Sequence, residues 1–151
     1  MKQSRRIAVG GDHAGFEGSP PHYKPAVIHH LEELGYPVSD LGARGPESVD
    51  YPDFAAKVCE AILNGDADCG VLICGTGIGV AMAANRYKGI RAAPVATEEM
   101  VRLSRTHNNS NILCLGARIT PLDEALRFLD IWLDTPFSGG ERHTRRIEKM
   151  G

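Results

Sequence analysis

The sequence predicts a three-layer α/β/α domain, Rossmann-like, whose centre is a five-stranded parallel sheet. Short apolar runs rich in Val, Ile and Leu alternate along the chain with longer segments whose apolar residues recur every three or four positions. The short runs are almost wholly apolar, which is typical of strands buried on both faces. No linker or charge block interrupts the alternation over 151 residues, so we expect one domain spanning residues 1–151.

Each element is predicted from its own local pattern. The five runs with the length and composition of strands are Arg6–Gly11, Val38–Leu41, Gly70–Cys74, Ile90–Ala93 and Asn111–Leu115. The five segments with helical periodicity are Pro25–Leu34, Pro52–Leu63, Ile78–Tyr87, Glu98–Arg105 and Leu122–Leu133. The segment Gly18–Tyr23 contains two prolines and a glycine, so we expect a loop there. The basic stretch Arg142–Met150 has no strand after it, and we expect it to pack on another surface or on a partner subunit.

Composition excludes several functional classes. The 17 Lys and Arg residues are balanced by 19 Asp and Glu residues, so no overall basic field would attract nucleic acid or an anionic membrane. The most apolar stretch, Val71–Ala84, is shorter than the roughly 20 residues of a membrane span. The apolar run Ile7–Gly11 is too short for a signal peptide. We therefore expect a cytoplasmic protein with no nucleic-acid or membrane partner.

The four cysteines are expected to be reduced thiols. Cys59, Cys69, Cys74 and Cys114 show no CxxC spacing and lie in apolar segments. Three of them fit plain core positions, since free Cys is among the most buried residue types. Cys74 is the exception, because it stands at the end of a predicted strand directly before a glycine-rich turn.

Three loops hold polar residues that a plain connection does not need. They are Asp12-His13 after the first strand, Cys74 to Gly79 after the third strand, and His107 to Asn109 after the fourth helix. In parallel sheets, ligands bind beyond the carboxyl ends of the strands. We therefore expect the chemistry of this protein in these loops.

The turn after Cys74 contains Gly75, Gly77 and Gly79 between a strand and a helix. One interpretation is an anion cradle, since backbone N–H groups and a helix N-terminus would point into one small space. The other is a tight strand-to-helix turn without a ligand. Dinucleotide and P-loop motifs do not fit, because Val80 breaks a GxGxxG pattern and no Lys-Ser/Thr pair follows.

Cys74 has two interpretations as well. Amides and a helix N-terminus beside it would stabilise a thiolate that could act as a base or nucleophile, although a Cys that ends an apolar strand is more often inert. His107 favours chemistry, because an imidazole can move protons near neutral pH.

Five segments together resemble one known family. They are GGDHAGFE at 10–17, SVDYPDFA at 48–55, LICGTGIGVAMAANRYKGIRAA at 72–93, LSRTHNNSNILCLGAR at 103–118 and GGERHTRRIEKM at 139–150. Their order and length are similar to the ribose-5-phosphate isomerase B family, which includes allose- and galactose-6-phosphate isomerases. The resemblance covers nearly the whole chain.

The resemblance implies a cofactor-free and metal-free aldose-ketose isomerase that works through a cis-enediol(ate). It implies that Cys74 is the base, since the alternative Glu of some members falls on Val80. His107 corresponds to the residue that opens the sugar ring, with Asp12 as its partner across the sugar. Thr76 corresponds to a hydroxyl near the base, and the turn Gly75, Gly77, Ile78 and Gly79 to the oxyanion cradle. Asn108 and Tyr51 correspond to sugar contacts.

The resemblance also implies a phosphate-binding set made of His13, Arg118, Arg142 and Arg146, assembled across a dimer interface. Planar guanidinium groups suit phosphate, because each can donate paired hydrogen bonds. We expect a homodimer or a dimer of dimers, in which residues 139–151 pack on the partner subunit. The Gly18–Tyr23 segment departs from the family pattern by about six extra residues near the site entrance.

Three functions therefore remain open. The favoured one is isomerisation of ribose 5-phosphate and ribulose 5-phosphate. The second is the same chemistry on a hexose 6-phosphate such as allose or galactose 6-phosphate. The third is a phosphosugar-binding module without catalysis, which has no need of a thiol and an imidazole together.

Overall fold

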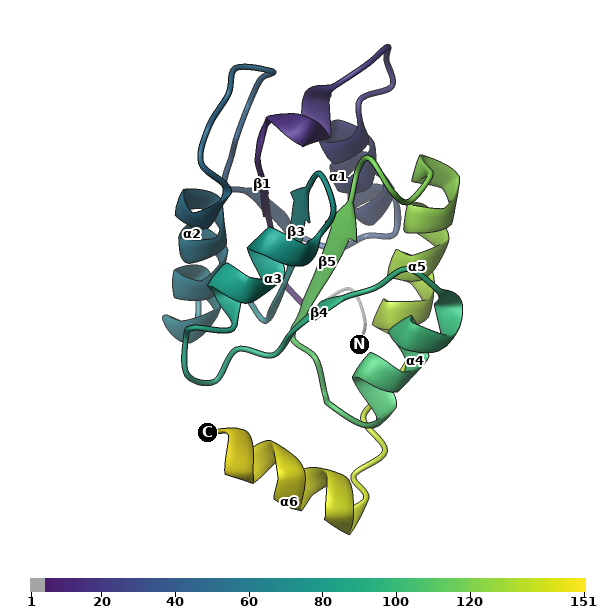
Figure 1. Cartoon of the computed structure of the whole chain (residues 1–151). Coiled ribbons are helices and arrows are strands. Elements are labelled where there is room, and N and C mark those ends of the chain that lie inside the picture. The colour runs from purple at the N-terminus through teal and green to yellow at the C-terminus, as the bar shows by residue number, and fades with distance from the viewer. Residues whose placement is uncertain (1–4) are drawn as a thin grey trace.

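A five-stranded parallel sheet forms the centre of the structure, a computed structural model that describes residues 5–151 (Figure 1). The strand order is β2-β1-β3-β5-β4. The strands are β1 (Ile7–Gly11), β2 (Val38–Asp40), β3 (Cys69–Cys74), β4 (Ala92–Pro94) and β5 (Ile112–Gly116). Every pairing between neighbours is parallel.

Helices cover both faces of this sheet and confirm the predicted three-layer α/β/α class. One face packs against α1 (Tyr23–Glu33), α4 (Glu98–Thr106) and α5 (Leu122–Asp134), and the other against α2 (Tyr51–Leu63) and α3 (Ile78–Ala84). Each interface has its own apolar core. Leu31, Val101 and Leu129 belong to the first, and Val58 and Val80 to the second.

The alternation of side chains along β3 decides which core each residue joins. Val71 and Ile73 pack toward α1 and α5, whereas Leu72 and Cys74 pack toward α2 and α3. Cys74 is therefore the last residue of a strand and lies directly beneath the start of α3. Cys59 and Cys114 also lie in this second core, and Cys69 lies in the first. All four cysteines are buried free thiols, as predicted.

Several element boundaries differ from the predicted ones. A helix was predicted over Ile78–Tyr87, but α3 ends at Ala84 because the Asn85 side chain turns to the backbone of Ala92. Its amide donates to Ala92 O and its carbonyl accepts from Ala92 N, at 2.9 and 2.8 Å. The strand predicted at Ile90–Ala93 accordingly starts at Ala92. A short 3-10 helix, η2 (His13–Phe16), was not predicted.

A loop was predicted over Gly18–Tyr23, with the first helix starting at Pro25. Residues 18–22 are non-helical, but α1 begins at Tyr23, two residues earlier than predicted. Lys24 in the first turn of α1 is almost fully buried, and its Nζ lies 2.5 Å from Asp40 Oδ1 at the end of β2. This ion pair ties the start of α1 to the sheet beneath η2, the element that carries His13.

The basic C-terminal stretch forms a helix, α6 (Glu141–Met150), that the sequence analysis did not identify as one. No residue of α6 is buried, and Figure 1 shows it apart from the sheet and the other helices. An amphipathic helix normally buries an apolar face against its own chain, and α6 does not. No helix within residues 5–151 has the length and apolar character that a membrane crossing requires.

Candidate active site

The carboxyl edge of the sheet gathers most of the predicted site. Asp12 follows β1, Cys74 ends β3 and Arg118 follows β5, and these three strands are neighbours in the sheet. The Arg118 N–H donates to Gly75 O at 2.9 Å, which joins the loop after β5 to the turn after β3. The positive charge of Arg118 interacts with both Asp12 and Cys74. The structure therefore brings together residues that are more than 100 positions apart.

Cys74 is buried, and its sulfur accepts a hydrogen bond from a backbone amide of the glycine turn. The Gly77 N–H lies 3.2 Å from Cys74 Sγ. Gly77 adopts φ +80°, a left-handed conformation that favours glycine and that turns this amide back toward the strand end. A donated amide stabilises sulfur most when the sulfur carries negative charge.

The amides of the glycine turn are partly engaged within the turn itself. Besides the Gly77 bond to sulfur, the Ile78 N–H donates to Thr76 Oγ1 at 3.1 Å. Thr76 is thus held in the turn by its own hydroxyl. At least one amide of the turn therefore donates to the Cys74 thiol and not to an external anion.

The side chains of Asp12 and His13 each accept a hydrogen bond from a backbone N–H group. Asp12 caps η2, and its Oδ1 accepts from Ala14 N at 2.9 Å. The Val49 N–H lies 3.2 Å from His13 Nδ1, which accepts it. A neutral His13 ring that accepts at Nδ1 carries its proton on Nε2, so this nitrogen is left as a donor.

Tyr51 lies at the start of α2 with its ring against the glycine turn. A side chain at Gly79 would place its Cβ 2.7 Å from the Tyr51 ring and 3.1 Å from its hydroxyl oxygen. Gly79 therefore allows Tyr51 to approach the turn closely, and the phenol remains 39% exposed. This position suits a contact to a polar ligand above the turn.

Arg118 is held by a partner that the sequence analysis did not single out. Its Nε and Nη2 donate to the two carboxylate oxygens of Glu17, both at 2.8 Å. Its Nη1 faces Gly75, where an added Cβ would lie only 2.9 Å away. The Arg118 hydrogen bonds hold the pKa of Glu17 below its ordinary value, so this carboxylate is ionised at neutral pH. The sequence offered one signal, since Glu17 ends the GGDHAGFE segment.

His107 and Asn108 do not join this group within one chain. His107 caps the C-terminus of α4 and so lies before β5, at the amino edge of the sheet. We expected His107 among the loops beyond the strand ends, and this placement is wrong because His107 precedes β5. The length of β5, five residues of about 3.3 Å each, separates the two edges by roughly 16 Å. His107 and Cys74 of the same chain therefore cannot contact one small substrate together.

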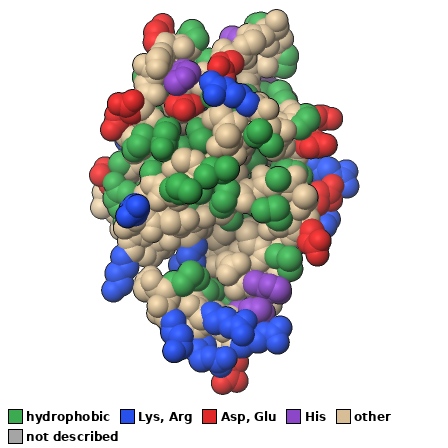
Figure 2. All heavy atoms as spheres, viewed as in Figure 1, with side chains coloured by type: hydrophobic (Ala, Val, Ile, Leu, Met, Phe, Trp, Pro, Cys, Tyr) green, Lys and Arg blue, Asp and Glu red, His purple; other side chains and the backbone are tan. Residues whose placement is uncertain are grey.

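The arginines of α6 accompany His107 at the amino edge. The His143 ring stacks on the His107 ring with centroids 4.2 Å apart. The positive charges of Arg142 and Arg146 contribute to a lowered pKa for His143, after the larger effect of desolvation and the effect of His107. Figure 2 shows Lys, Arg and His side chains gathered at this end of the molecule. The candidate site residues thus fall into two groups, one at each edge of the sheet, which we call the two half-sites.

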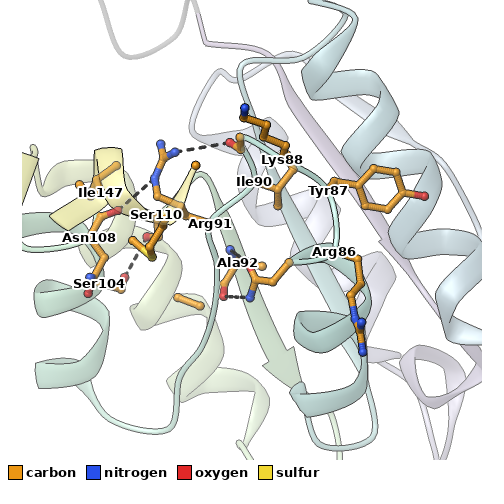
Figure 3. Close-up of a pocket in the computed structure, with 15 residues that line it drawn as sticks. Arg86, Tyr87, Lys88, Ile90, Arg91, Ala92, Ser104, Asn108, Ser110 and Ile147 are labelled. Carbon is orange, nitrogen blue, oxygen red and sulfur yellow. Dashed lines mark hydrogen bonds between the residues drawn. The ribbon is translucent and has the colours of Figure 1, made fainter. Parts of the chain in front are cut away.

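A cavity of about 850 Å³ separates α6 from the rest of the chain (Figure 3). Ile147 and Met150 line it on the side of α6, and the segment from Asn85 to Ala93 lines it opposite. Arg91 fixes the wall near Asn108, because its Nε donates to the carbonyl oxygens of Asn108 and Asn109 at 3.1 and 3.0 Å. This cavity lies away from Cys74, and it shows that α6 is not packed tightly on its own chain.

No group of three or more His, Cys, Asp or Glu side chains within the described residues 5–151 is placed to hold a metal ion. The two half-sites instead offer a buried thiol, two carboxylates, imidazoles and guanidinium groups. Such groups can transfer protons and bind an anion.

Comparison with known proteins agrees with this chemistry. The family model for Ribose/Galactose Isomerase matches residues 7–150. Ribose-5-phosphate isomerase B of Escherichia coli is 41% identical over 97% of this chain and 94% of its own length. Two solved structures share the fold. The ribose 5-phosphate isomerase of Thermotoga maritima is 49% identical, with a TM-score of 0.90 and 97% of each chain covered. Ribose-5-phosphate isomerase B of Clostridium thermocellum is 47% identical, with a TM-score of 0.91 over 97% of this chain and 95% of its own.

Proposed function

Because the chain belongs to the ribose/galactose isomerase family, we propose that it interconverts ribose 5-phosphate and ribulose 5-phosphate. The observation that carries this proposal is the placement of Cys74. The thiol ends β3, accepts the Gly77 amide and lies beside Asp12 and Arg118. A binding module for sugar phosphates has no need of a buried thiol that accepts a backbone amide at the carboxyl edge of the sheet.

In the proposed reaction, the Cys74 thiolate takes the proton from C2 of the open-chain aldose. The electron pair of that C–H bond forms the C1–C2 double bond, and the carbonyl oxygen at C1 becomes the enediolate oxygen. The O2 proton then passes to O1, and Cys74 returns its proton to C1, which gives the ketose with no net gain or loss of protons. In this proposal the Thr76 hydroxyl and the amides of the Gly75–Gly79 turn donate to the enediolate oxygens, and the Gly77 amide, which contacts Cys74, stays with the base.

Asp12 and His107 serve the ring-opening step in this proposal. Opening a furanose needs a base for the anomeric hydroxyl and an acid for the ring oxygen. Asp12 lies at the carboxyl edge and His107 at the amino edge. The two can flank one sugar only when the sugar lies between two chains. Asn108 accompanies His107, and Tyr51 accompanies Asp12.

The two half-sites therefore support a homodimer with two composite active sites. His13 and Arg118 of one chain and Arg142 and Arg146 of the other would bind the phosphate together. The segment 139–151 supports this arrangement, since α6 buries no residue on its own chain. An exposed apolar surface on α3 supports it as well, because Ile78 and Met82 are 52% and 65% exposed. Figure 2 shows hydrophobic side chains over the middle of this face.

The test is a comparison of kcat/KM for ribose 5-phosphate, allose 6-phosphate and galactose 6-phosphate with the purified protein. We expect ribose 5-phosphate to have the highest value. A preference of more than tenfold for a hexose phosphate would assign the same mechanism to a larger sugar. Tight binding of these sugars without any isomerisation would contradict the enzymatic function.

A further inference from the structure

Glu17 pairs with Arg118, one of the two side chains of this chain that would bind phosphate, and it follows the short helix that carries the other, His13. It caps the end of η2, the short helix that begins with His13, and its carboxylate reaches Arg118 after β5. The Arg118 hydrogen bonds are the main cause of its lowered pKa. An acidic side chain is therefore in direct contact with a residue of the candidate anion site.

The two hydrogen bonds decide which edge of Arg118 faces the site. A guanidinium group has five N–H donors. Glu17 takes the Nε–H and one N–H of Nη2, at 2.8 Å each. The donors of Nη1 and the remaining donor of Nη2 stay on the other edge. Nη1 faces Gly75, which has no side chain to cover it.

The Arg118 side chain is 58% exposed, so no packing around it would otherwise select one rotamer. A long cationic side chain loses much rotational freedom when it is ordered. Because the Glu17–Arg118 pair is already formed before the anion binds, most of this entropy cost is not part of the binding free energy. The negative charge of Glu17 repels a bound anion, but solvent screens this repulsion because both side chains of the pair are exposed.

We propose that Glu17 is a positioning residue for anion binding, which holds Arg118 with its Nη1 edge toward the glycine turn. The identity of the anion, the phosphate group of the substrate, rests on the proposed function. Glu17 touches neither the reacting carbon atoms nor Cys74 in this proposal. Its effect passes through Arg118 alone.

The experiment measures the affinity of the full-length protein for inorganic phosphate by titration calorimetry, which requires no catalysis. We expect Glu17→Ala to weaken phosphate binding by about fivefold to tenfold, and Glu17→Gln, which keeps one acceptor, to have a smaller effect. In the isomerase assay, KM for the sugar phosphate should rise by a similar factor while kcat stays within about twofold. In an Arg118→Ala background, Glu17→Ala should cause no further loss.

Asp68→Asn is the matched control. Asp68 forms a similar forked pair with Arg6, with Nε and Nη2 at 3.2 and 3.1 Å and similar exposure, at the opposite edge of the sheet from Glu17 and Arg118. We expect this variant to bind phosphate like the unaltered protein. Unchanged or tighter phosphate binding in Glu17→Ala, a further loss in the Arg118→Ala background, or no phosphate binding by the unaltered protein would each overturn the proposal. A protein that binds phosphate as expected but isomerises no sugar would contradict the proposed function alone.

Discussion

The imidazole rings of His107 and His143 stack face to face, with centroids 4.2 Å apart and an angle of 13° between their planes. This contact joins α6 to the end of α4. The Ser138 side chain reinforces it, because Ser138 Oγ donates to Thr106 O at 2.7 Å. Since α6 buries no residue, these two contacts position Arg142 and Arg146 beside His107.

The stack predicts an acid-sensitive attachment of α6. Desolvation lowers the pKa of His143, and the positive charges of His107, Arg142 and Arg146 lower it further. The folded arrangement therefore favours neutral His143, and this contribution is lost as the pH falls below the ordinary His value of about 6.5. Hydrogen exchange of the α6 amides, corrected for intrinsic rates, should be less protected at about pH 5.5 than at about pH 7.5. In His143→Phe, which stacks without titrating, this pH difference should shrink; an unchanged difference would place its origin elsewhere.

Cys74→Ala should remove nearly all turnover and leave substrate binding within a few-fold. The proposed base acts in the proton-transfer step, so its loss lowers kcat far more than it changes KM. Iodoacetamide should inactivate the unaltered enzyme, and substrate should protect it. Cys59→Ala is a suitable comparison, because burial raises the pKa of that thiol to about 11 and it has no place in the reaction. Near-normal kcat in Cys74→Ala would assign the base to another residue.

His107→Asn should harm cyclic substrates more than acyclic ones. A furanose such as ribose 5-phosphate must be opened before isomerisation, whereas a short aldose phosphate that cannot close a ring needs no such step. We expect the loss in kcat/KM to be at least about tenfold larger for ribose 5-phosphate than for the acyclic substrate. An equal loss for both would rule out a ring-opening role.

Two inactive variants should restore activity when their subunits exchange. In a mixed dimer of Cys74→Ala with Arg142→Ala/Arg146→Ala, one composite site receives the thiol from one chain and both arginines from the other. Random exchange of equal amounts should return about a quarter of the unaltered activity. The measurement is the isomerase rate after incubation, with subunit exchange followed separately by native mass spectrometry. Exchange without recovered activity would show that the arginines serve their own chain or no catalytic step.

Lys24 should contribute strongly to the stability of the fold, because it is buried, unlike most lysines, and forms an ion pair. Its side chain is 1% exposed and pairs with Asp40, which is 34% exposed. Lys24→Met would leave the half-buried Asp40 carboxylate without its partner, and we expect the free energy of unfolding to fall by about 2 kcal/mol. Arg44 also approaches Asp40, at 3.8 Å, but it is 72% exposed. Arg44→Ala should therefore cost no more than about 0.5 kcal/mol in the same urea titration.

The sequence alone determined the fold class and the half-site at the carboxyl edge. Strands and helices follow from local periodicity, and a residue that ends a strand of a parallel sheet must lie at its carboxyl edge. Asp12 and Cys74 could be placed together on that basis. The loop at Gly18–Pro21 followed from the limits that proline and glycine set on the backbone.

Tertiary structure decided what local pattern cannot express. The Glu17–Arg118 pair joins residues 101 positions apart, and it depends on β1, β3 and β5 being neighbours. The Val49 bond to His13 depends on the path of a loop without periodicity. His107 lies at the opposite edge because it precedes β5 rather than following β4 closely. The α6 helix could not be predicted from hydrophobic periodicity. Such periodicity marks a helix face that packs on the core of its own chain, and no residue of α6 is buried.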